Sequence, residues 1–145
     1  MSKEPSLRSD FVYFDTVDTR WSDNDVYGHV NNVAYYAYFD TVINCLLINK
    51  GWLDISNSPT IGVVAETGCR YFSSISYPET VDVGLAVERI GNTSVVYRLG
   101  VFSQKSDSVA AEGRFVHVYV DRESRKPHAI PEALRDGLRA YLKSQ

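Results

Sequence analysis

The longest apolar run in the sequence extends from Val33 to Ile48. Its apolar residues occupy most faces of a helix rather than one stripe, which is typical of a helix that is buried nearly all round. Asn31 or Asn32 can act as the N-cap, because an asparagine side-chain oxygen accepts hydrogen bonds from the free backbone N–H groups of the first turn. Lys50 and Gly51 form the expected C-terminal stop. We therefore expect one long helix between these two ends.

The rest of the chain shows the period-two alternation of β-strands. Strand-like runs, separated by turn residues at short intervals, cover 11–21, 60–72, 79–90, 94–103 and 109–120. Short connections of this kind favour antiparallel hairpins. A charged turn then leads to a short helix that begins at Pro131. The order strand, long helix, four strands and short helix predicts an α+β domain, with a five-stranded antiparallel sheet that covers the long helix.

A helix that is apolar on every side needs more cover than one sheet provides, because the sheet contacts only part of its circumference. A second subunit is the natural cover. We therefore expect a homodimer or a larger homo-oligomer.

Length and composition narrow the class of protein. With 145 residues, the chain suits one domain over residues 11–145, after a flexible polar tail over residues 1–10. A net charge of −3 argues against a protein that coats nucleic acid. No apolar run approaches the ~20 residues that cross a bilayer, and the N-terminus has no signal-peptide pattern, so we expect a cytoplasmic protein without membrane contact. Cys45 and Cys69 are expected to be free thiols, with a disulfide as the weaker alternative.

The candidate chemistry lies just before the long helix, in the segment Arg20–Asn32. Asp23 and Asp25 are ordinary turn or cap residues in one interpretation. In the other, Asp25 is a nucleophile or general base, and backbone N–H groups around Asn31 and Asn32 stabilise an oxyanion. Acyl transfer needs both parts, and a helix N-terminus favours negative charge.

Other residues of the segment fit the same chemistry. Gly28 permits a close approach of backbone to ligand. His29 either polarises a carbonyl, orients Asp25 or positions water, or is a structural histidine. His117 is expected to be a satisfied sheet residue, and His128 lies in an exposed turn. No histidine pair has metal-ligand spacing, and the Gly-x-Ser-x-Gly, Walker and Gly-x-Gly-x-x-Gly motifs are absent, so we expect neither a metal nor a cofactor.

The segment Trp21–Asp40 resembles the signature Asp-x-Asp-x-x-Gly-(His)-Val-Asn-Asn-x-x-Tyr-x-x-Tyr-Phe-Glu/Asp of hotdog-fold acyl-CoA thioesterases of the 4-hydroxybenzoyl-CoA thioesterase type. The resemblance implies a hotdog fold and metal-independent hydrolysis of an acyl-CoA thioester to a free acid and CoA. It also implies that Asp25 is the catalytic carboxylate, that the helix start supplies the oxyanion N–H, and that dimers or tetramers carry active sites at subunit interfaces.

Further site residues are expected by analogy. Asn31, Gly28 and Tyr35 are candidate substrate-binding residues, although a tyrosine on this helix is more often a core or interface residue. Glu66 either faces the active site across a dimer or forms an ion pair with Arg70 or Arg98. Where some relatives grip the CoA phosphates with basic residues, this chain offers backbone N–H groups, hydroxyls and a nearby arginine, namely Arg89, Gly91, Asn92, Thr93 and Ser94.

Two other functions remain open from the sequence. A non-catalytic module that binds acyl-CoA or fatty acid would use the same fold, although the presence of Asp25 counts against it. A hydratase or dehydratase would need a paired histidine and acidic residue, which we do not find.

Overall fold

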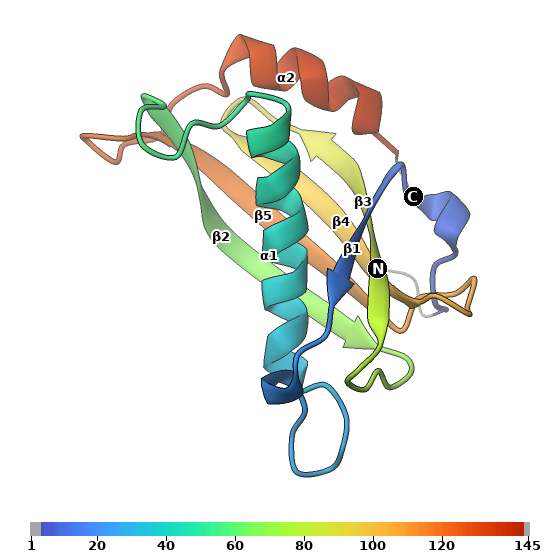
Figure 1. Cartoon of the computed structure of the whole chain (residues 1–145). Coiled ribbons are helices and arrows are strands. Elements are labelled where there is room, and N and C mark those ends of the chain that lie inside the picture. Colours follow the sequence, from blue (N-terminus) through green and yellow to red (C-terminus); the bar gives the residue numbers. More distant parts are fainter. Residues whose placement is uncertain (1–3, 144–145) are drawn as a thin grey trace.

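The computed structural model describes residues 4–143 and contains one five-stranded antiparallel sheet with the strand order β1-β3-β4-β5-β2. The strands are β1 (Tyr13–Asp18), β2 (Thr60–Tyr71), β3 (Thr80–Ile90), β4 (Ser94–Ser103) and β5 (Ala111–Asp121). Helix α1 (Asn32–Asn49) crosses one face of the sheet, and α2 (Glu132–Leu138) lies near the C-terminal end of α1 (Figure 1). The predicted α+β class with five antiparallel strands is confirmed.

The ends of α1 follow the sequence signals. The Asn31 side-chain oxygen accepts a hydrogen bond from the backbone N–H of Val33 at 2.9 Å, so Asn31 is the N-cap. Gly51 has a φ of +75°, the left-handed conformation that glycine favours after a helix. Helix α1 has the bounds that the sequence analysis expects, although its 18 residues, or about 27 Å at ~1.5 Å per residue, make it a helix of moderate length.

Helix α1 is buried along one side only. Its buried residues, which pack on the inner face of β3, β4 and β5, are Tyr35, Tyr38, Phe39, Val42, Ile43, Leu46 and Leu47. The opposite side, with Val33, Ala37, Thr41 and Ile48, is exposed in the single chain. The sheet of one chain therefore covers only one side of the helix, as the sequence analysis expects of a single subunit, and burial of the other side by a second subunit stays a prediction.

Strand β2 forms one edge of the sheet and pairs with β5 on its other side. Residues 62–67 are all exposed, and this run includes the apolar side chains of Val63 and Val64. An edge strand presents unpaired backbone N–H and C=O groups to any strand that approaches it. The edge at β2 is therefore long, partly apolar and uncovered.

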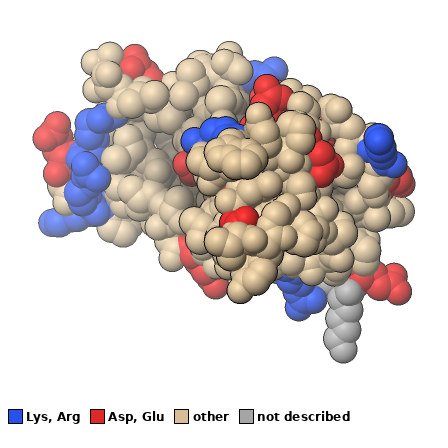
Figure 2. Space-filling view, turned by 60° about the horizontal axis from the view of Figure 1, so that its bottom comes forward, with Lys and Arg blue, Asp and Glu red and all other residues tan. Residues whose placement is uncertain are grey.

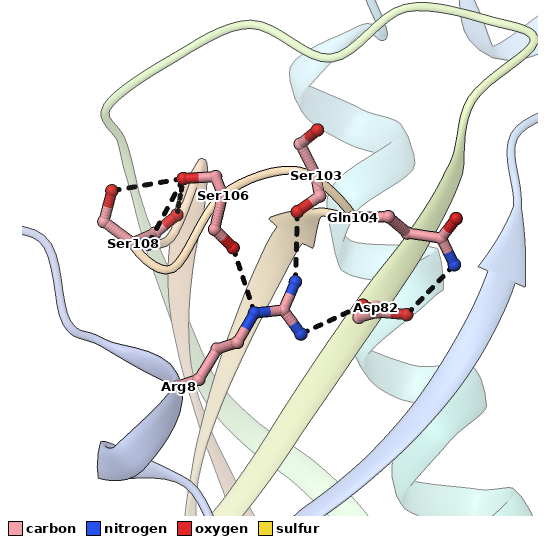
Figure 3. Close-up of polar contacts among 6 residues, drawn as sticks. All are labelled: Arg8, Asp82, Ser103, Gln104, Ser106 and Ser108. Carbon is pink, nitrogen blue, oxygen red and sulfur yellow. Dashed lines mark hydrogen bonds and ion pairs between the residues drawn. The ribbon is translucent and has the colours of Figure 1, made fainter.

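The N-terminal segment contacts the outer face of the sheet. The Arg8 side chain donates three hydrogen bonds, to the carbonyl oxygens of Ser106 and Ser103 at 2.9 and 3.1 Å and to the Asp82 carboxylate at 2.9 Å (Figure 3). Phe11 is buried in a small cluster on the same face. Residues 1–3 of the expected tail lie outside the described residues, whereas the later part of that segment has these defined contacts.

Cys45 and Cys69 are free thiols, as the sequence analysis expects. No helix within residues 4–143 combines the length and the apolar character that crossing a membrane requires.

Candidate active site

The loop that precedes α1 is folded around Asp23, whose side chain is buried. The carboxylate accepts hydrogen bonds from the Arg20 guanidinium and backbone N–H, both at 2.9 Å, and from the Tyr38 hydroxyl at 2.7 Å. The Asp23 carbonyl also accepts from the backbone N–H of Asn31 at 2.8 Å. These contacts join the start of the loop to its end and to α1.

The electrostatics of this cluster agree with a structural role. Burial raises the pKa of Asp23, but the hydrogen bonds from Arg20 and Tyr38 outweigh that effect and hold the pKa below its usual value. Burial, followed by the hydrogen bond to Asp23, raises the pKa of Tyr38. Asp23 therefore stays ionised and bound to its neighbours, and it is not available for chemistry.

Asp25 lies in a tight turn and is only partly buried. Its backbone N–H donates to the His29 carbonyl at 2.9 Å, and its carbonyl accepts from the Gly28 N–H at 3.1 Å. Gly28 has a φ of +84°, which a side chain would strain. The Oδ1 atom accepts from the Tyr27 N–H at 2.9 Å, whereas Oδ2 has no partner within residues 4–143. The turn thus holds one carboxylate oxygen and leaves the other available.

A hollow of about 700 Å³ opens beside Asp25. Its lining residues are Trp21, Ser22, Asn24, Asp25, Val26, Tyr27, Gly28 and Asn31. The side chains of Trp21, Val26 and Tyr27 are largely solvent-exposed in the single chain. Figure 2 views this end of the molecule, where uncharged side chains form most of the surface and charged ones are scattered. An exposed apolar surface around a carboxylate marks a place where another molecule binds.

The N-terminus of α1 lies at the edge of this hollow. Asn31, which lines the hollow, caps the helix, while the backbone N–H of Asn32 has no hydrogen-bond partner in the described part of the chain. The carbonyl of Asn32 accepts a hydrogen bond from the Tyr71 hydroxyl at 3.2 Å. A free N–H at the positive end of a helix can stabilise an anionic oxygen.

The segment between β2 and β3 holds the loop in place through two hydrogen bonds. The Ser76 hydroxyl donates to the Gly28 carbonyl at 2.9 Å, and the Tyr77 N–H donates to the Asn24 side chain at 3.0 Å. The sequence analysis assigned no role to Tyr71 or to this segment. No local signal identifies them, because about 40 to 50 residues separate each of them from the loop and only the folded sheet brings them together.

His29 and Tyr35 differ in their placement. His29 is exposed and does not line the hollow, although its carbonyl closes the Asp25 turn. Tyr35 is buried beneath the loop, where its ring packs edge-on against Tyr71 at 5.3 Å between centroids. Burial raises the pKa of Tyr35 to about 12. Tyr35 therefore belongs to the core that carries the site.

Glu66 is not in the neighbourhood of Asp25 within one chain. It is paired in register with Val116, so it faces away from α1, and its side chain is 68% exposed. Its carboxylate lies 3.4 Å from the Arg114 guanidinium. The interpretation of Glu66 as a paired residue is supported, but with Arg114 rather than Arg70 or Arg98.

The expected CoA-binding residues lie at the opposite end of α1 from Asp25, in the β3–β4 turn beside α2 (Figure 1). Arg135 of α2 donates to the carbonyl oxygens of Gly91 and Asn92 at 2.7 and 3.2 Å. Arg89 is exposed at the end of β3, next to this turn. Within one chain, this turn and the Asp25 hollow are therefore separate.

Comparison with known proteins identifies the family. The model of the thioesterase-like superfamily matches residues 19–138, which is most of the chain and includes the Asp25 loop. The chain belongs to the thioesterase-like superfamily. The thioesterase resemblance is therefore confirmed at that level, while the narrower 4-hydroxybenzoyl-CoA thioesterase type stays a prediction.

Solved structures place this thioesterase-like chain among hotdog folds. The PA5185 protein from Pseudomonas aeruginosa strain PAO1 is 47% identical, with a TM-score of 0.94, over 98% of this chain and 100% of that one. A predicted thioesterase from Bacillus stearothermophilus is 25% identical, with a TM-score of 0.79, over 92% and 98% of the two chains. The DHNA-CoA thioesterase from Staphylococcus aureus, at 23% identity and a TM-score of 0.77 over 88% and 87%, shares the fold. The hotdog fold is thus confirmed.

Proposed function

We propose that this protein hydrolyses an acyl-CoA thioester to a free carboxylic acid and CoA, without a metal ion, with Asp25 as the catalytic carboxylate. Membership in the thioesterase-like superfamily supports thioester hydrolysis as the general reaction. The observation that carries the finer proposal is the position of Asp25, beside an open hollow at the N-terminus of α1 and with one carboxylate oxygen free.

The reaction breaks the bond between the acyl carbon and sulfur. Water supplies a hydroxyl group to the acyl carbon, and its proton goes to the CoA sulfur. Asp25 acts either as the base that removes the proton from water or as the nucleophile that forms a mixed anhydride, which water then opens. In both routes the Asn32 N–H faces the carbonyl oxygen as negative charge develops on it. His29, Asn31, Gly28 and Tyr35 position this loop or the substrate.

A panel of acyl-CoA esters tests the proposal directly. The purified protein is incubated with straight-chain and aromatic acyl-CoA esters, and the released thiol is measured. Release of free CoA from at least one ester is expected. Saturable binding without any thiol release would instead favour the non-catalytic binding module.

We also propose that the active protein is a homodimer or a tetramer of such dimers. The uncovered edge of β2 and the exposed side of α1 support this assembly, because both surfaces are partly apolar and uncovered in one chain. A two-fold axis at the β2 edge places two copies of this strand antiparallel. The CoA-binding turn then comes from one subunit and the Asp25 loop from the other.

We expect the wild-type chain to sediment as a dimer or a tetramer of the 16.3 kDa subunit, and Ala65→Lys to yield a smaller species because it breaks the contact at the β2 edge. Ala65 lies in the middle of the exposed run, so two lysines would meet near the two-fold axis and repel each other. Thr16→Lys, on the other edge strand β1, is the matched control and should leave the dimer intact. A concentration-independent wild-type monomer in sedimentation would contradict the proposed assembly.

A further inference from the structure

A second cavity lies at the other end of α1 from Asp25. It has a volume of about 260 Å³ and is enclosed by the C-terminal half of α1, the loop after it, and the neighbouring ends of β2 and β5. Asn44, Trp52, Gly62, His117 and Tyr119 line it, together with Thr60, Arg122, Pro131 and aliphatic residues. Its size is just below the ~300–1,000 Å³ of pockets that enclose drug-sized ligands, so it suits part of a ligand.

His117 is the unusual residue of this cavity. It is 2% exposed, and neither ring nitrogen has a hydrogen-bond partner within the described residues. The expectation that His117 has hydrogen-bond partners in the sheet is therefore wrong. Its ring packs edge-on against the Tyr97 ring, and this contact gives the ring nitrogens no hydrogen bond. A buried polar group without a partner is unfavourable, so His117 is poised to bind a polar group that enters the cavity.

The chemistry of the imidazole defines that polar group. Burial lowers the pKa of His117, against a smaller opposite effect of the Asp40 charge, so the ring is neutral near pH 7. A neutral imidazole has one N–H donor and one acceptor nitrogen. A hydroxyl group, which both donates and accepts, satisfies it better than a methyl group does.

Gly62 packs closely against Tyr119 and His117 in the wall of the cavity. A Cβ atom at this position would lie 3.0 Å from the Tyr119 ring and 3.3 Å from the His117 Nδ1 atom. On the same strand, a Cβ at Gly68 would meet nothing within 4 Å. Gly62 and Gly68 therefore form a matched pair for substitution, because only Gly62 lies against the cavity.

The direction of β2 connects this cavity to the active site of a second subunit. Asn44 lies about 18 Å along α1 from Asn32 at ~1.5 Å per residue, so the cavity is remote from the Asp25 of its own chain. Strand β2 starts beside the cavity at Thr60 and ends at Tyr71, which bonds to Asn32. Antiparallel pairing of two β2 edges therefore brings the cavity toward Asp25 of the partner subunit.

We infer that this cavity receives the far end of the acyl group whose thioester is held at Asp25 of the partner subunit, and that His117 selects acyl groups that carry a distal hydroxyl. This inference rests on the proposed thioesterase function and names its substrate class. His117 is then a specificity residue, not a catalytic one, because it meets the substrate far from the reacting bond.

The test compares kcat/KM for matched thioesters, hexanoyl-CoA with 6-hydroxyhexanoyl-CoA and octanoyl-CoA with 8-hydroxyoctanoyl-CoA. The wild-type protein should prefer the hydroxylated member of at least one pair, and His117→Phe should reduce that preference about fivefold to tenfold, because the hydroxyl then loses its partner. His117→Gln should restore part of it. An unchanged ratio in His117→Phe at both lengths would overturn the inference.

The paired glycines provide a steric test. Gly62→Ala should lower kcat/KM for the longer thioesters more than for acetyl-CoA, since the methyl group narrows the cavity where the chain must enter. Gly68→Ala is the control and should keep the wild-type dependence on chain length. Equal profiles for both variants would count against the cavity as the acyl site.

A binding measurement separates failure of this inference from failure of the proposed function. Asp25→Asn protein with ¹⁵N-labelled indoles has two tryptophan signals, Trp21 beside the Asp25 hollow and Trp52 in the cavity. Both should shift with one Kd when 8-hydroxyoctanoyl-CoA is added, whereas CoA alone should leave Trp52 unchanged. A shift of the Trp21 signal alone would overturn the inference but would not contradict the proposed function. Shifts of both tryptophan signals, without hydrolysis by the wild-type protein, would contradict the proposed function but support the cavity as a binding site.

Discussion

Asp25→Asn is expected to reduce kcat/KM for acyl-CoA hydrolysis by about 10²–10⁴-fold, the range that a general base or nucleophile contributes. An amide neither accepts a proton from water nor attacks an acyl carbon at neutral pH. The asparagine oxygen can still accept the hydrogen bond that the Tyr27 N–H donates to Oδ1, so the turn and the hollow should persist. Thiol release measures the first effect, and thermal unfolding measures the second.

Asp107→Asn is the matched control for this substitution. Asp107 is an exposed acidic residue in a turn on the N-terminal segment's side of the sheet, and its backbone carbonyl, which the substitution keeps, accepts from Arg8. The same loss of one negative charge should leave hydrolysis within about twofold of wild type, since exposed charges beyond a Debye length of ~10 Å are largely screened. Wild-type activity in Asp25→Asn would remove Asp25 from the proposed mechanism.

The sequence predicts the elements that local signals control. The Asn31 cap, the apolar run and Gly51 define α1, because capping and left-handed glycine conformations depend on neighbouring residues alone. The turn at Asp25 is predicted for the same reason, since its hydrogen bonds join residues 25, 27, 28 and 29. The buried contacts of Asp23 are visible only in the structure, where Tyr38 approaches Asp23 from the helix.

The side of the sheet on which Glu66 lies could not be predicted from alternation. A β-bulge between Val64 and Glu66 inserts one extra residue into β2. Without the bulge, Val64 and Glu66 would share a face, because side chains alternate with period two. With the bulge, Val64 pairs with His117 on the inner face and Glu66 with Val116 on the outer face. No residue pattern in the strand predicts this bulge.

The lack of hydrogen-bond partners at the His117 ring nitrogens among residues 4–143 could also not be predicted from the sequence. A histidine between Val116 and Val118 fits a strand, and the alternation correctly indicates burial on one face. Whether its nitrogens find partners depends on Gly62, Trp52 and Asn44, which distant parts of the chain bring to the cavity. A cavity is a property of tertiary packing, so local periodicity carries no information about it.

Asn32→Pro is expected to lower kcat by about 10²–10³-fold, the usual effect of removing one oxyanion donor. Proline has no backbone N–H, so the substitution deletes the single donor that the mechanism assigns to the carbonyl oxygen. Asn32 is the first helical residue, where proline is well tolerated. Asn31 before it has φ −64° and ψ 143°, the extended conformation that a residue before proline prefers.

The helix should therefore survive Asn32→Pro, and the free energy of unfolding should change by less than about 1 kcal/mol. The control Asn32→Ala removes the exposed side chain but keeps the N–H, so it should retain kcat near the wild-type value. This pair separates the backbone donor from the amide side chain, which a single alanine substitution cannot do. If Asn32→Pro folds and keeps full kcat while Asn32→Ala loses it, the side chain and not the helix N-terminus stabilises the oxyanion.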